Sequence, residues 1–354
     1  MSPRWWSKYV RPRVAVVLFN LGGPDRPEAI RPFLVNLFSD PAILRVPFFV
    51  RPFLARRIAA ARLAPARASY AVLGGRSPLL ELTRAQAGAL EAEMTELDVK
   101  CFIAMRYWHP LSDETARAVR DWKPDEVVLF PLYPQYSSTT AGSSLTAWRE
   151  AAARAGLVAN TTVLCCYPTD AGYIGATATL VRQAWKQART KLDASIGLRV
   201  LFSAHGLPEA IVQAGDPYQW QIEQTVAAVL AEWQRAPDWV ICYQSRATPQ
   251  RWLEPSTEHE IERAARDKVA VLVVPIAFVS EHSETLVELD ADYRGLAERL
   301  GVPGYFRVPT QGADTAFIAA LAKLVRRARA HGPGLCSHAG GRFCPADRKL
   351  CPFQ

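Results

Sequence analysis

Two sets of titratable side chains have the types and spacing for proton or metal chemistry. The first is a single histidine, His205, which closely follows the apolar run at residues 198–202. The second is a series of acids at steps of three and four residues, which places them on one helix face: Glu281, Glu284, Glu288 and Asp292. Such carboxylates repel one another unless protons or cations lie among them. The series predicts a path for protons or metal ions, and its alternative is a solvated helix surface. For a lone histidine such as His205, the alternative is a purely structural role.

The cysteines form a third candidate site near the end of the chain. The sequence has 7 cysteines, and Cys336, Cys344 and Cys351 are separated by only 7 and 6 residues. An odd number of cysteines without an export signal argues against a disulfide framework. Zinc sites usually begin with gaps of about two to four residues, which disfavours zinc. The crowding predicts a metal site, with a tail of unliganded thiols as the alternative.

The elements that position these side chains are predicted from an alternation of apolar runs with amphipathic stretches. The runs lack polar alternation, which is typical of strands buried on both faces: residues 14–19, 126–130, 162–167, 198–202, 239–243 and 269–275. Helical patterns lie between them: residues 82–97, 113–123, 145–156, 172–190, 219–234, 258–267 and 290–300. The alternation predicts an α/β protein with two Rossmann-like, doubly wound parallel-sheet domains.

Ligands of doubly wound sheets bind beyond the carboxyl ends of the strands. His205 and the acidic series both follow predicted strands, so we expect them to face one ring-sized cavity between the domains from opposite sides. The expected boundaries are a tail at 1–12, a first domain at 13–158 with a lip at 40–70, a second domain at 159–312, a helix at 313–330 that returns to the first domain, and a cysteine-rich extension at 331–354.

Composition narrows the class of protein. Of the 354 residues, 49% are hydrophobic and 21% charged, which is ordinary globular composition, and the net charge is +8. No apolar run reaches the roughly 18 residues that span a bilayer. The first 13 residues lack the apolar core of a signal peptide, so we expect a cytoplasmic protein. The basic surplus suits an anionic partner, but no nucleic-acid motif is present, and the arginines cluster with aliphatic residues.

Segments around these sites, taken in order, resemble a ferrochelatase of the bacterial type with a cysteine-rich C-terminal extension. The matching motifs run from about residue 14 to residue 325: 19–24 (FNLGGP), 106–111 (RYWHPL), 133–140 (YPQYSSTT) with 142–144 (GSS), 201–208 (LFSAHGLP) with 215–218 (GDPY), 244–245 (QS) with Trp252, and 275–290 (PIAFVSEHSETLVELD). Each motif is weak alone. In register over most of the chain they make a specific match.

The resemblance implies insertion of Fe2+, the metal substrate, into protoporphyrin IX to give protohaem. His205 would take the pyrrole protons, because histidine titrates near neutral pH. Glu284 would assist as a metal ligand or proton carrier, and the metal path would comprise His205, Glu284, Glu281, Glu288 and Asp292. Family positions at the porphyrin pocket are occupied by Leu21, Arg62, Tyr70, Ser77, Arg106, Tyr133 and Trp252. Some relatives carry Met where Leu21 stands, so an axial thioether contact is absent here.

The lip combines apolar and basic residues, among them Phe48, Phe49, Phe53, Arg56 and Arg57. A buried helical hairpin would explain the apolar residues. A lip that touches anionic lipid and admits a membrane-dissolved porphyrin explains the arginines as well. We therefore expect peripheral contact with the inner membrane surface, by a monomer or homodimer.

Many ferrochelatases hold a [2Fe–2S] cluster on three C-terminal cysteines and one internal cysteine. A [2Fe–2S] cluster takes four thiolates, and Cys336, Cys344 and Cys351 supply three. The fourth would be Cys166 or Cys165; neighbours on a strand face opposite ways, so only one of them is expected to ligate.

Two other functions compete with this interpretation. One is a chelatase for another metal or tetrapyrrole, such as a cobaltochelatase or a coproporphyrin ferrochelatase. The other is a non-catalytic haem or porphyrin carrier, which has no need of an acidic path.

Overall fold

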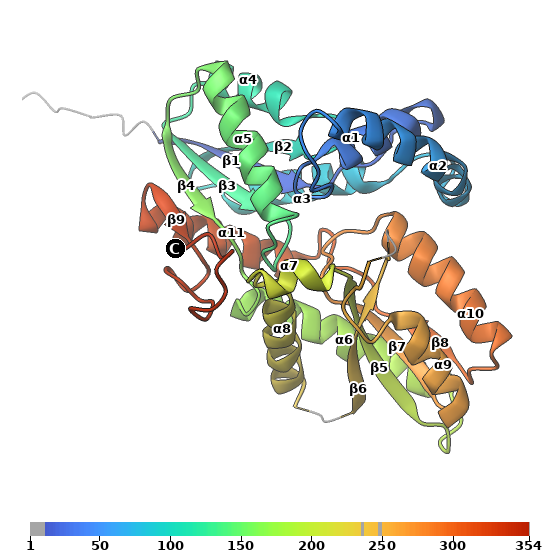
Figure 1. The fold of residues 1–354 in the computed structure, drawn as a ribbon. Helices are drawn as coiled ribbons and strands as arrows, with labels where there is room; N and C mark the ends of the chain where they lie inside the picture. Colours follow the sequence, from blue (N-terminus) through green and yellow to red (C-terminus); the bar gives the residue numbers. More distant parts are fainter. Residues whose placement is uncertain (1–10, 235–236, 247–249, 354) are drawn as a thin grey trace, which may run out of the picture.

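The computed structural model describes residues 11–234, 237–246 and 250–353, so most of the expected N-terminal tail lies outside the described residues. Within them the chain forms two parallel sheets, one in the upper and one in the lower half of Figure 1. The first has the order β2-β1-β3-β4-β9: β1 Arg13–Asn20, β2 Asp98–Met105, β3 Glu126–Pro131, β4 Asn160–Leu164 and β9 Gly334–Cys336. The second has the order β6-β5-β7-β8: β5 Leu198–His205, β6 Asp238–Gln244, β7 Ala270–Pro275 and β8 Tyr305–Arg307. The predicted fold class is confirmed.

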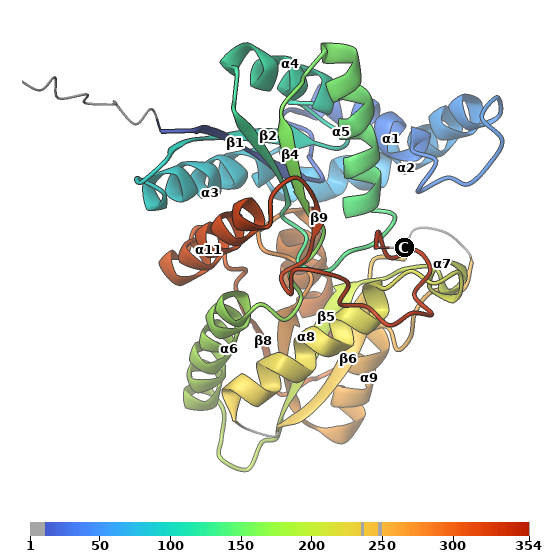
Figure 2. The same ribbon diagram turned by 90° about the vertical axis from the view of Figure 1, so that its left-hand side faces the viewer.

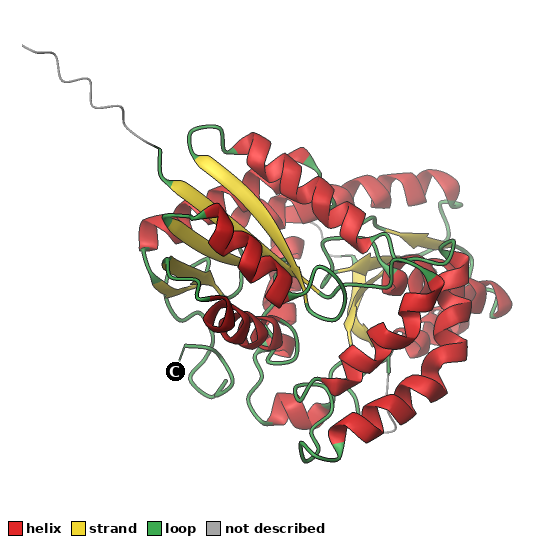
Figure 3. Ribbon diagram, turned by 90° about the horizontal axis from the view of Figure 1, so that it is seen from above, coloured by secondary structure: helices red, strands yellow, loops and turns green. Residues whose placement is uncertain are grey.

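Helices cover both faces of each sheet (Figures 1 and 3). The first unit carries the short turn η1 Pro27–Ala29 and the helices α1 Ile30–Ser39, α2 Arg51–Val72, α3 Leu79–Glu93, α4 Ser112–Trp122 and α5 Ala141–Ala155. The second carries α6 Ala171–Lys191, α7 Glu209–Gln213, α8 Tyr218–Trp233, α9 Thr257–Asp267, the π-helix η2 Glu284–Tyr293 and α10 Arg294–Arg299. In the described part of the chain no helix is long and apolar enough to cross a membrane.

Alternation along the strands builds the core. In β1, Val14, Val16 and Leu18 face a core that includes residues of both sheets, whereas Ala15, Val17 and Phe19 face the side covered by α4 and α5. The helix α11 (Thr315–His331) packs against α3, β4 and α6, and Figure 2 shows it between the two units. The two units therefore share one hydrophobic core.

The expected boundary at 158/159 differs from the observed sheets. Strand β4 pairs with β3, from Glu126↔Asn160 to Leu129↔Val163, and so belongs to the first sheet. The cysteine-rich extension adds β9 beside β4, an element that the sequence analysis did not predict. The first sheet is thus completed by the end of the chain.

Candidate active site

His205 and Glu284 meet beyond the carboxyl ends of the strands of the second sheet. His205 is the last residue of β5, and Glu284 is the first residue of η2. The distance from His205 Nε2 to Glu284 Oε2 is 3.8 Å, with 38% and 22% of the two side chains exposed. His205 Nδ1 lies 2.6 Å from the carbonyl oxygen of Gly206. A neutral imidazole that donates from Nδ1 to this carbonyl leaves its Nε2 lone pair directed at the Glu284 side.

The expectation that these two groups act from opposite sides of a ring is wrong. A flat ring between two atoms needs two van der Waals contacts, about 7 Å in total. The 3.8 Å separation is too short for this. The two side chains therefore lie on the same side of the crevice.

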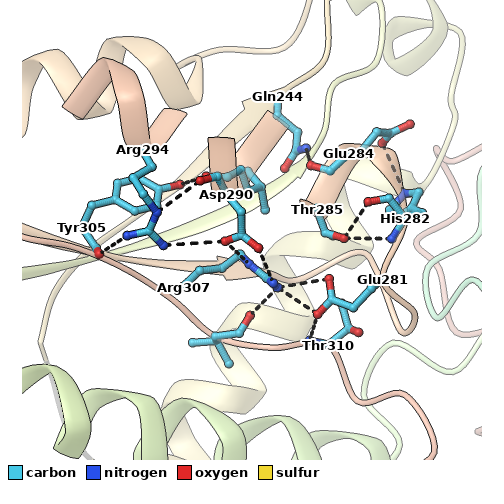
Figure 4. A network of polar contacts seen from close by, with 12 residues as sticks. Gln244, Glu281, His282, Glu284, Thr285, Asp290, Arg294, Tyr305, Arg307 and Thr310 are labelled. Carbon is cyan, nitrogen blue, oxygen red and sulfur yellow. Dashed lines mark hydrogen bonds and ion pairs between the residues drawn. The ribbon is translucent and has the colours of Figure 1, made fainter. Parts of the chain in front are cut away.

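A second histidine, which the sequence analysis missed, faces the same carboxylate. His282 Nε2 lies 3.7 Å from Glu284 Oε2 (Figure 4). The His282 ring packs on Phe278. Burial opposes ionisation, but His205 and His282 together lower the pKa of the Glu284 carboxyl to about 2. Glu284 is therefore an anion between two imidazoles at any physiological pH. The signal in the sequence was the position of His282 within the motif that contains Glu284.

Glu288 has a different environment. Its carboxylate accepts hydrogen bonds from Ser245 N (2.8 Å), Gln244 Nε2 (3.2 Å), Tyr293 OH (2.8 Å) and the Ser245 hydroxyl. Ser245 has a φ of 65°, which is uncommon for a residue other than glycine and often marks a functional site. Burial and the charge of Glu284 raise the pKa of Glu288 despite these donors. Two acids of the predicted series thus differ: Glu284 is held ionised, and Glu288 is more easily protonated.

The other two acids of the series are not brought to this pair. Glu281 precedes η2 and is paired with Arg307, whose Nη1 lies 2.9 and 3.2 Å from its two carboxylate oxygens. Thr310 N donates to the same carboxylate at 2.9 Å. Asp292 is exposed on η2. The assumption of an uncompensated stripe was wrong for Glu281, because its cation comes from β8.

Aromatic side chains surround the pair. Burial raises the pKa of Tyr70 to about 12, with Glu284 close enough to contribute. Burial also raises the pKa of Tyr133, again with a contribution from Glu284. Trp252 is buried and lies beside Gly206, where an added Cβ would come within 3.3 Å of the indole ring. Tyr70 and Tyr133 come from the first unit, so both units contribute to the crevice.

The other predicted porphyrin residues lie farther along the first unit. Ser77 is buried against Gly23, where a Cβ would approach the serine side chain to 2.5 Å. Leu21 packs with the apolar residues of α1 and α2. Arg62 is exposed on α2. These contacts do not test the predicted roles of Ser77, Leu21 and Arg62 in porphyrin binding.

Arg106 is engaged by a buried acid. Its Nη2 lies 2.8 Å from Asp40 Oδ2, and its Nε donates to Ser143 Oγ at 2.6 Å. Tyr107 OH donates to Asp40 Oδ2 at 2.7 Å. Asp40 therefore fixes Arg106 at the base of the lip, where Phe48, Phe49 and Phe53 are 79%, 72% and 70% exposed. These exposed rings contradict the buried-hairpin alternative.

Five buried thiols form a second cluster, called here the cysteine patch: Cys165, Cys166, Cys336, Cys344 and Cys351. Cys165 and Cys166 follow the end of β4, and their sulfurs lie 3.4 Å apart. The expectation that they face opposite ways is wrong, because the chain has left the strand at Leu164. The Cys165 N–H donates to the Cys336 carbonyl at 2.9 Å.

Gln221 of α8 connects the patch to the second unit. Its Nε2 donates to the sulfurs of Cys344 (3.1 Å) and Cys166 (3.6 Å), and its Oε1 accepts from Tyr136 N at 2.7 Å. The tail is also tied to the second unit by Leu350 N, which donates to the Gly215 carbonyl at 3.0 Å. Figure 2 shows the tail running from β9 toward α8. It thus spans both units.

Electrostatic interactions link both Cys165 and Cys166 to the tail thiols: besides its hydrogen bond to Cys166 and its burial, Cys351 and Cys336 help to raise the pKa of Cys165. Burial and then Cys166 raise the pKa of Cys336 to about 11. Cys166 also opposes ionisation of Cys344 and Cys351, although their mutual hydrogen bond influences both pKa values more. Cys166 therefore lies near all three tail thiols. Nowhere in the described residues do three or more His, Cys, Asp or Glu side chains converge in the geometry of a single-ion site.

Comparisons with known proteins identify the family. The ferrochelatase family model matches residues 13–329. A ferrochelatase of Caulobacter vibrioides (strain NA1000 / CB15N) is 52% identical over 346 residues, covering 97% of this chain and 98% of its own. One from Phenylobacterium zucineum (strain HLK1) is 52% identical over 340 residues, covering 93% and 97%.

A solved structure, SirB from Bacillus subtilis with Fe3+, shares the fold. Its TM-score is 0.50 at 12% identity, covering 90% of this chain and 96% of its own. The likeness to SirB is one of fold, with 90% of this chain covered. The chain belongs to the ferrochelatase family.

Proposed function

We propose that this chain inserts Fe2+ into protoporphyrin IX, with His205 as the base. Glu284 would contact the metal and stabilise the positive charge that develops on His205. Membership of the family makes the chain a lyase that inserts iron into a porphyrin. The observation that carries the proposed roles is the 3.8 Å approach of His205 Nε2 to an ionised Glu284.

The reaction replaces two pyrrole N–H protons with one Fe2+, so the product side is the iron porphyrin and two protons. His205 Nε2 carries the free lone pair and accepts a pyrrole proton. The imidazolium that forms is stabilised by the adjacent Glu284 carboxylate. A carboxyl with a pKa of about 2 is a poor proton carrier but a good ligand for a hard or borderline cation. We therefore assign Glu284 to charge stabilisation and metal contact.

Glu288 is better suited to carry the proton away. Its raised pKa favours transient protonation, and it lies one step farther along η2 than Glu284. Asp292 is exposed and would connect this path to solvent. Glu281, occupied by Arg307, has no part in the path.

The porphyrin would lie against the aromatic side chains of the crevice. Tyr70, Tyr133 and Trp252 offer apolar ring surface on both units. Arg62, Tyr70 and Ser77 are assigned to the lip, where cationic and hydroxyl groups meet propionates. Leu21 and Arg106 are assigned to the pocket. The exposed Phe48, Phe49 and Phe53, with Arg45, Arg56 and Arg57 nearby, suit contact with an anionic membrane surface on the cytoplasmic side.

We further propose that the cysteine patch holds a [2Fe–2S] cluster through Cys336, Cys344, Cys351 and Cys166. The donor set fits, because these thiols are buried together and Cys166 lies near all three tail thiols. Four thiolates shared between two irons need not converge on one point, as the ligands of a single ion must. A bound cluster supplies one-electron redox chemistry. Gln221 would orient the thiolates of Cys344 and Cys166 by hydrogen bonds.

An anaerobic metallation assay tests the proposed function. Purified protein is given Fe2+ or Co2+ with protoporphyrin or coproporphyrin at equal concentrations, and the product spectrum is followed. Fastest turnover with Fe2+ and protoporphyrin is expected. Preference for coproporphyrin or Co2+ would assign a different chelatase activity, and tight porphyrin binding without metallation would contradict catalysis altogether.

A further inference from the structure

The two acids assigned to iron insertion lie on a helix of unusual type. The segment Glu284–Tyr293 is a π-helix, whereas the sequence predicted an ordinary helix at residues 290–300. Long π-helices are rare, because their i→i+5 hydrogen bonds are less favourable than those of an α-helix, and they occur frequently at functional sites. Interactions from outside the helix are therefore needed to hold this register.

Arg307 supplies such interactions at two points of the chain (Figure 4). Its Nε and Nη2 donate to the two oxygens of Asp290, each at 2.7 Å. Its Nη1 donates to Glu281 at 2.9 and 3.2 Å. Glu281 lies just before η2 and Asp290 lies within it, so one guanidinium brackets the turns that carry Glu284 and Glu288.

The backbone that carries this cation is itself fixed. Arg307 is the last residue of β8 and pairs with Val273 of β7 in the parallel sheet. Its side chain is only 11% exposed. Burial opposes its ionisation, but Asp290 and Glu281 more than offset this and raise the pKa of Arg307. The guanidinium is therefore a rigid, permanently charged anchor.

A second contact from β8 also stabilises the turn of η2 that contains Asp290. Tyr305 OH donates to the Leu289 carbonyl at 2.6 Å, beside Asp290. On the other side of η2, Ser245 and Gln244 of the β6 end hold Glu288. Relaxation of η2 toward an α-helix would change the angular offset between Glu284 and Glu288. One acid would then lose its partner, either His205 or Ser245.

We propose that Arg307 is a positioning residue for iron insertion: by bridging Glu281 and Asp290 it holds the π-helical register in which Glu284 faces His205 while Glu288 faces Ser245. This inference rests on the proposed function for the roles of the two acids. Arg307 touches neither porphyrin nor metal in this account. It acts on the rate only through the helix.

Arg307→Lys is the first test, because a lysine keeps the charge but cannot form the forked contacts to two carboxylates. The expected result is a fall in kcat on the order of tenfold and a higher KM for Fe2+, since small displacements of catalytic groups are costly. Porphyrin affinity, measured by fluorescence, stays within about twofold. Backbone amides in 284–293 exchange faster with deuterium. Wild-type kcat together with wild-type exchange would overturn the proposal.

Arg294→Lys is the matched control. Arg294 also contacts Asp290, at 3.8 Å, and donates to the Tyr305 carbonyl, but none of its contacts with the described residues reaches Glu281. Its kcat and exchange are expected to stay within about twofold of wild type. A loss as large as that of Arg307→Lys would show that any weakened contact to Asp290 suffices, and would overturn the bridging role.

A variant in which all three charges are neutralised guards against a folding defect. Glu281→Gln, Asp290→Asn and Arg307→Gln together leave no unpaired buried charge but remove the forked ion pairs. We expect it to fold, with faster exchange in 284–293 and a lower kcat. Normal exchange and kcat in this folded variant would overturn the proposal even if Arg307→Lys failed to fold.

Glu284→Gln separates this inference from the proposed function. Full activity in Glu284→Gln would refute the assigned role of the acid, while the exchange of 284–293 in Arg307→Lys would still report on the bridge. A slow Glu284→Gln beside a fast Arg307→Lys with unchanged exchange would refute the bridge alone.

Discussion

The crevice at His205 and the cysteine patch both gather titratable side chains from distant parts of the sequence, but they differ in access. In the crevice, His205 is 38% and Glu284 22% exposed, and their nearest polar atoms stand 3.8 Å apart, too far for a hydrogen bond. In the patch, the cysteines are at most 6% exposed. The open site suits substrates that enter and leave. The sealed site suits a group that stays with the protein.

His205→Ala gives the largest effect expected in the crevice. Loss of the base should lower kcat on the order of a thousandfold, within the range for general-base catalysis. Porphyrin binding, followed by fluorescence quenching, should persist because the aromatic walls are intact. His259→Ala, a change at an exposed histidine of α9, is the control. Near-normal turnover of His205→Ala would remove His205 from the mechanism.

Glu284→Gln should lower kcat on the order of a hundredfold, because the imidazolium loses its counter-charge. The change keeps the size of the side chain, so an unchanged circular dichroism spectrum and retained porphyrin binding would indicate intact folding. Glu298→Gln, at an exposed position of α10, should leave turnover unaffected. Equal turnover in the two variants would contradict the assigned role of Glu284 in the crevice.

Substitutions in the cysteine patch should affect the visible absorbance of the purified protein more than its rate of iron insertion. Purified wild-type protein is expected to be brown, with about two irons and two sulfides per chain. Cys336→Ser and Cys166→Ser should lose the visible absorbance, whereas Cys165→Ser and the remote Cys101→Ser should keep it. Retention of iron and sulfide in Cys166→Ser with loss in Cys165→Ser would reassign the fourth ligand. Absorbance without iron and sulfide would end the cluster proposal.

A smaller effect concerns pH and stability. The pKa of Glu284 is lowered from 4.5 to about 2, so its contribution is present above pH 4.5 and is lost as the pH falls toward 2. The contribution is at most on the order of 3 kcal/mol. Denaturant titrations should show wild type losing stability over this window relative to Glu284→Gln. Parallel curves for the two proteins would contradict the depressed pKa.

The sequence was sufficient for the parts of the fold that depend on periodicity. Buried runs such as 198–202 lack polar alternation because both faces of a parallel strand are covered. It failed where a short element depends on its neighbour: Gly334–Cys336 is too short to show any period and becomes a strand only because β4 offers a free edge. The predicted boundary at 158/159 differs from the structure for a related reason: the apolar pattern of a strand does not indicate which sheet the strand belongs to.

The site was predictable where motifs mark it and not where contacts cross the fold. His205 and Glu284 could be named from their motifs, and the structure brings them together. The neutralisation of Glu281 could not be predicted, because Arg307 lies 26 residues away on another strand. His282 was missed because a histidine beside an acid in sequence gives no direction for its ring. The π-helical register also leaves no clear sequence pattern.

The account rests on His205 and Glu284 acting as one unit on one face of the porphyrin, and a double-mutant cycle tests this most directly. Initial rates of Fe2+ insertion are measured for wild type, His205→Ala, Glu284→Gln and the double variant, with porphyrin occupancy verified in each. The account predicts that the double variant is about as slow as His205→Ala alone, because groups acting as a unit are strongly non-additive. Rate losses that simply multiply would show that the two residues act independently and would contradict the account.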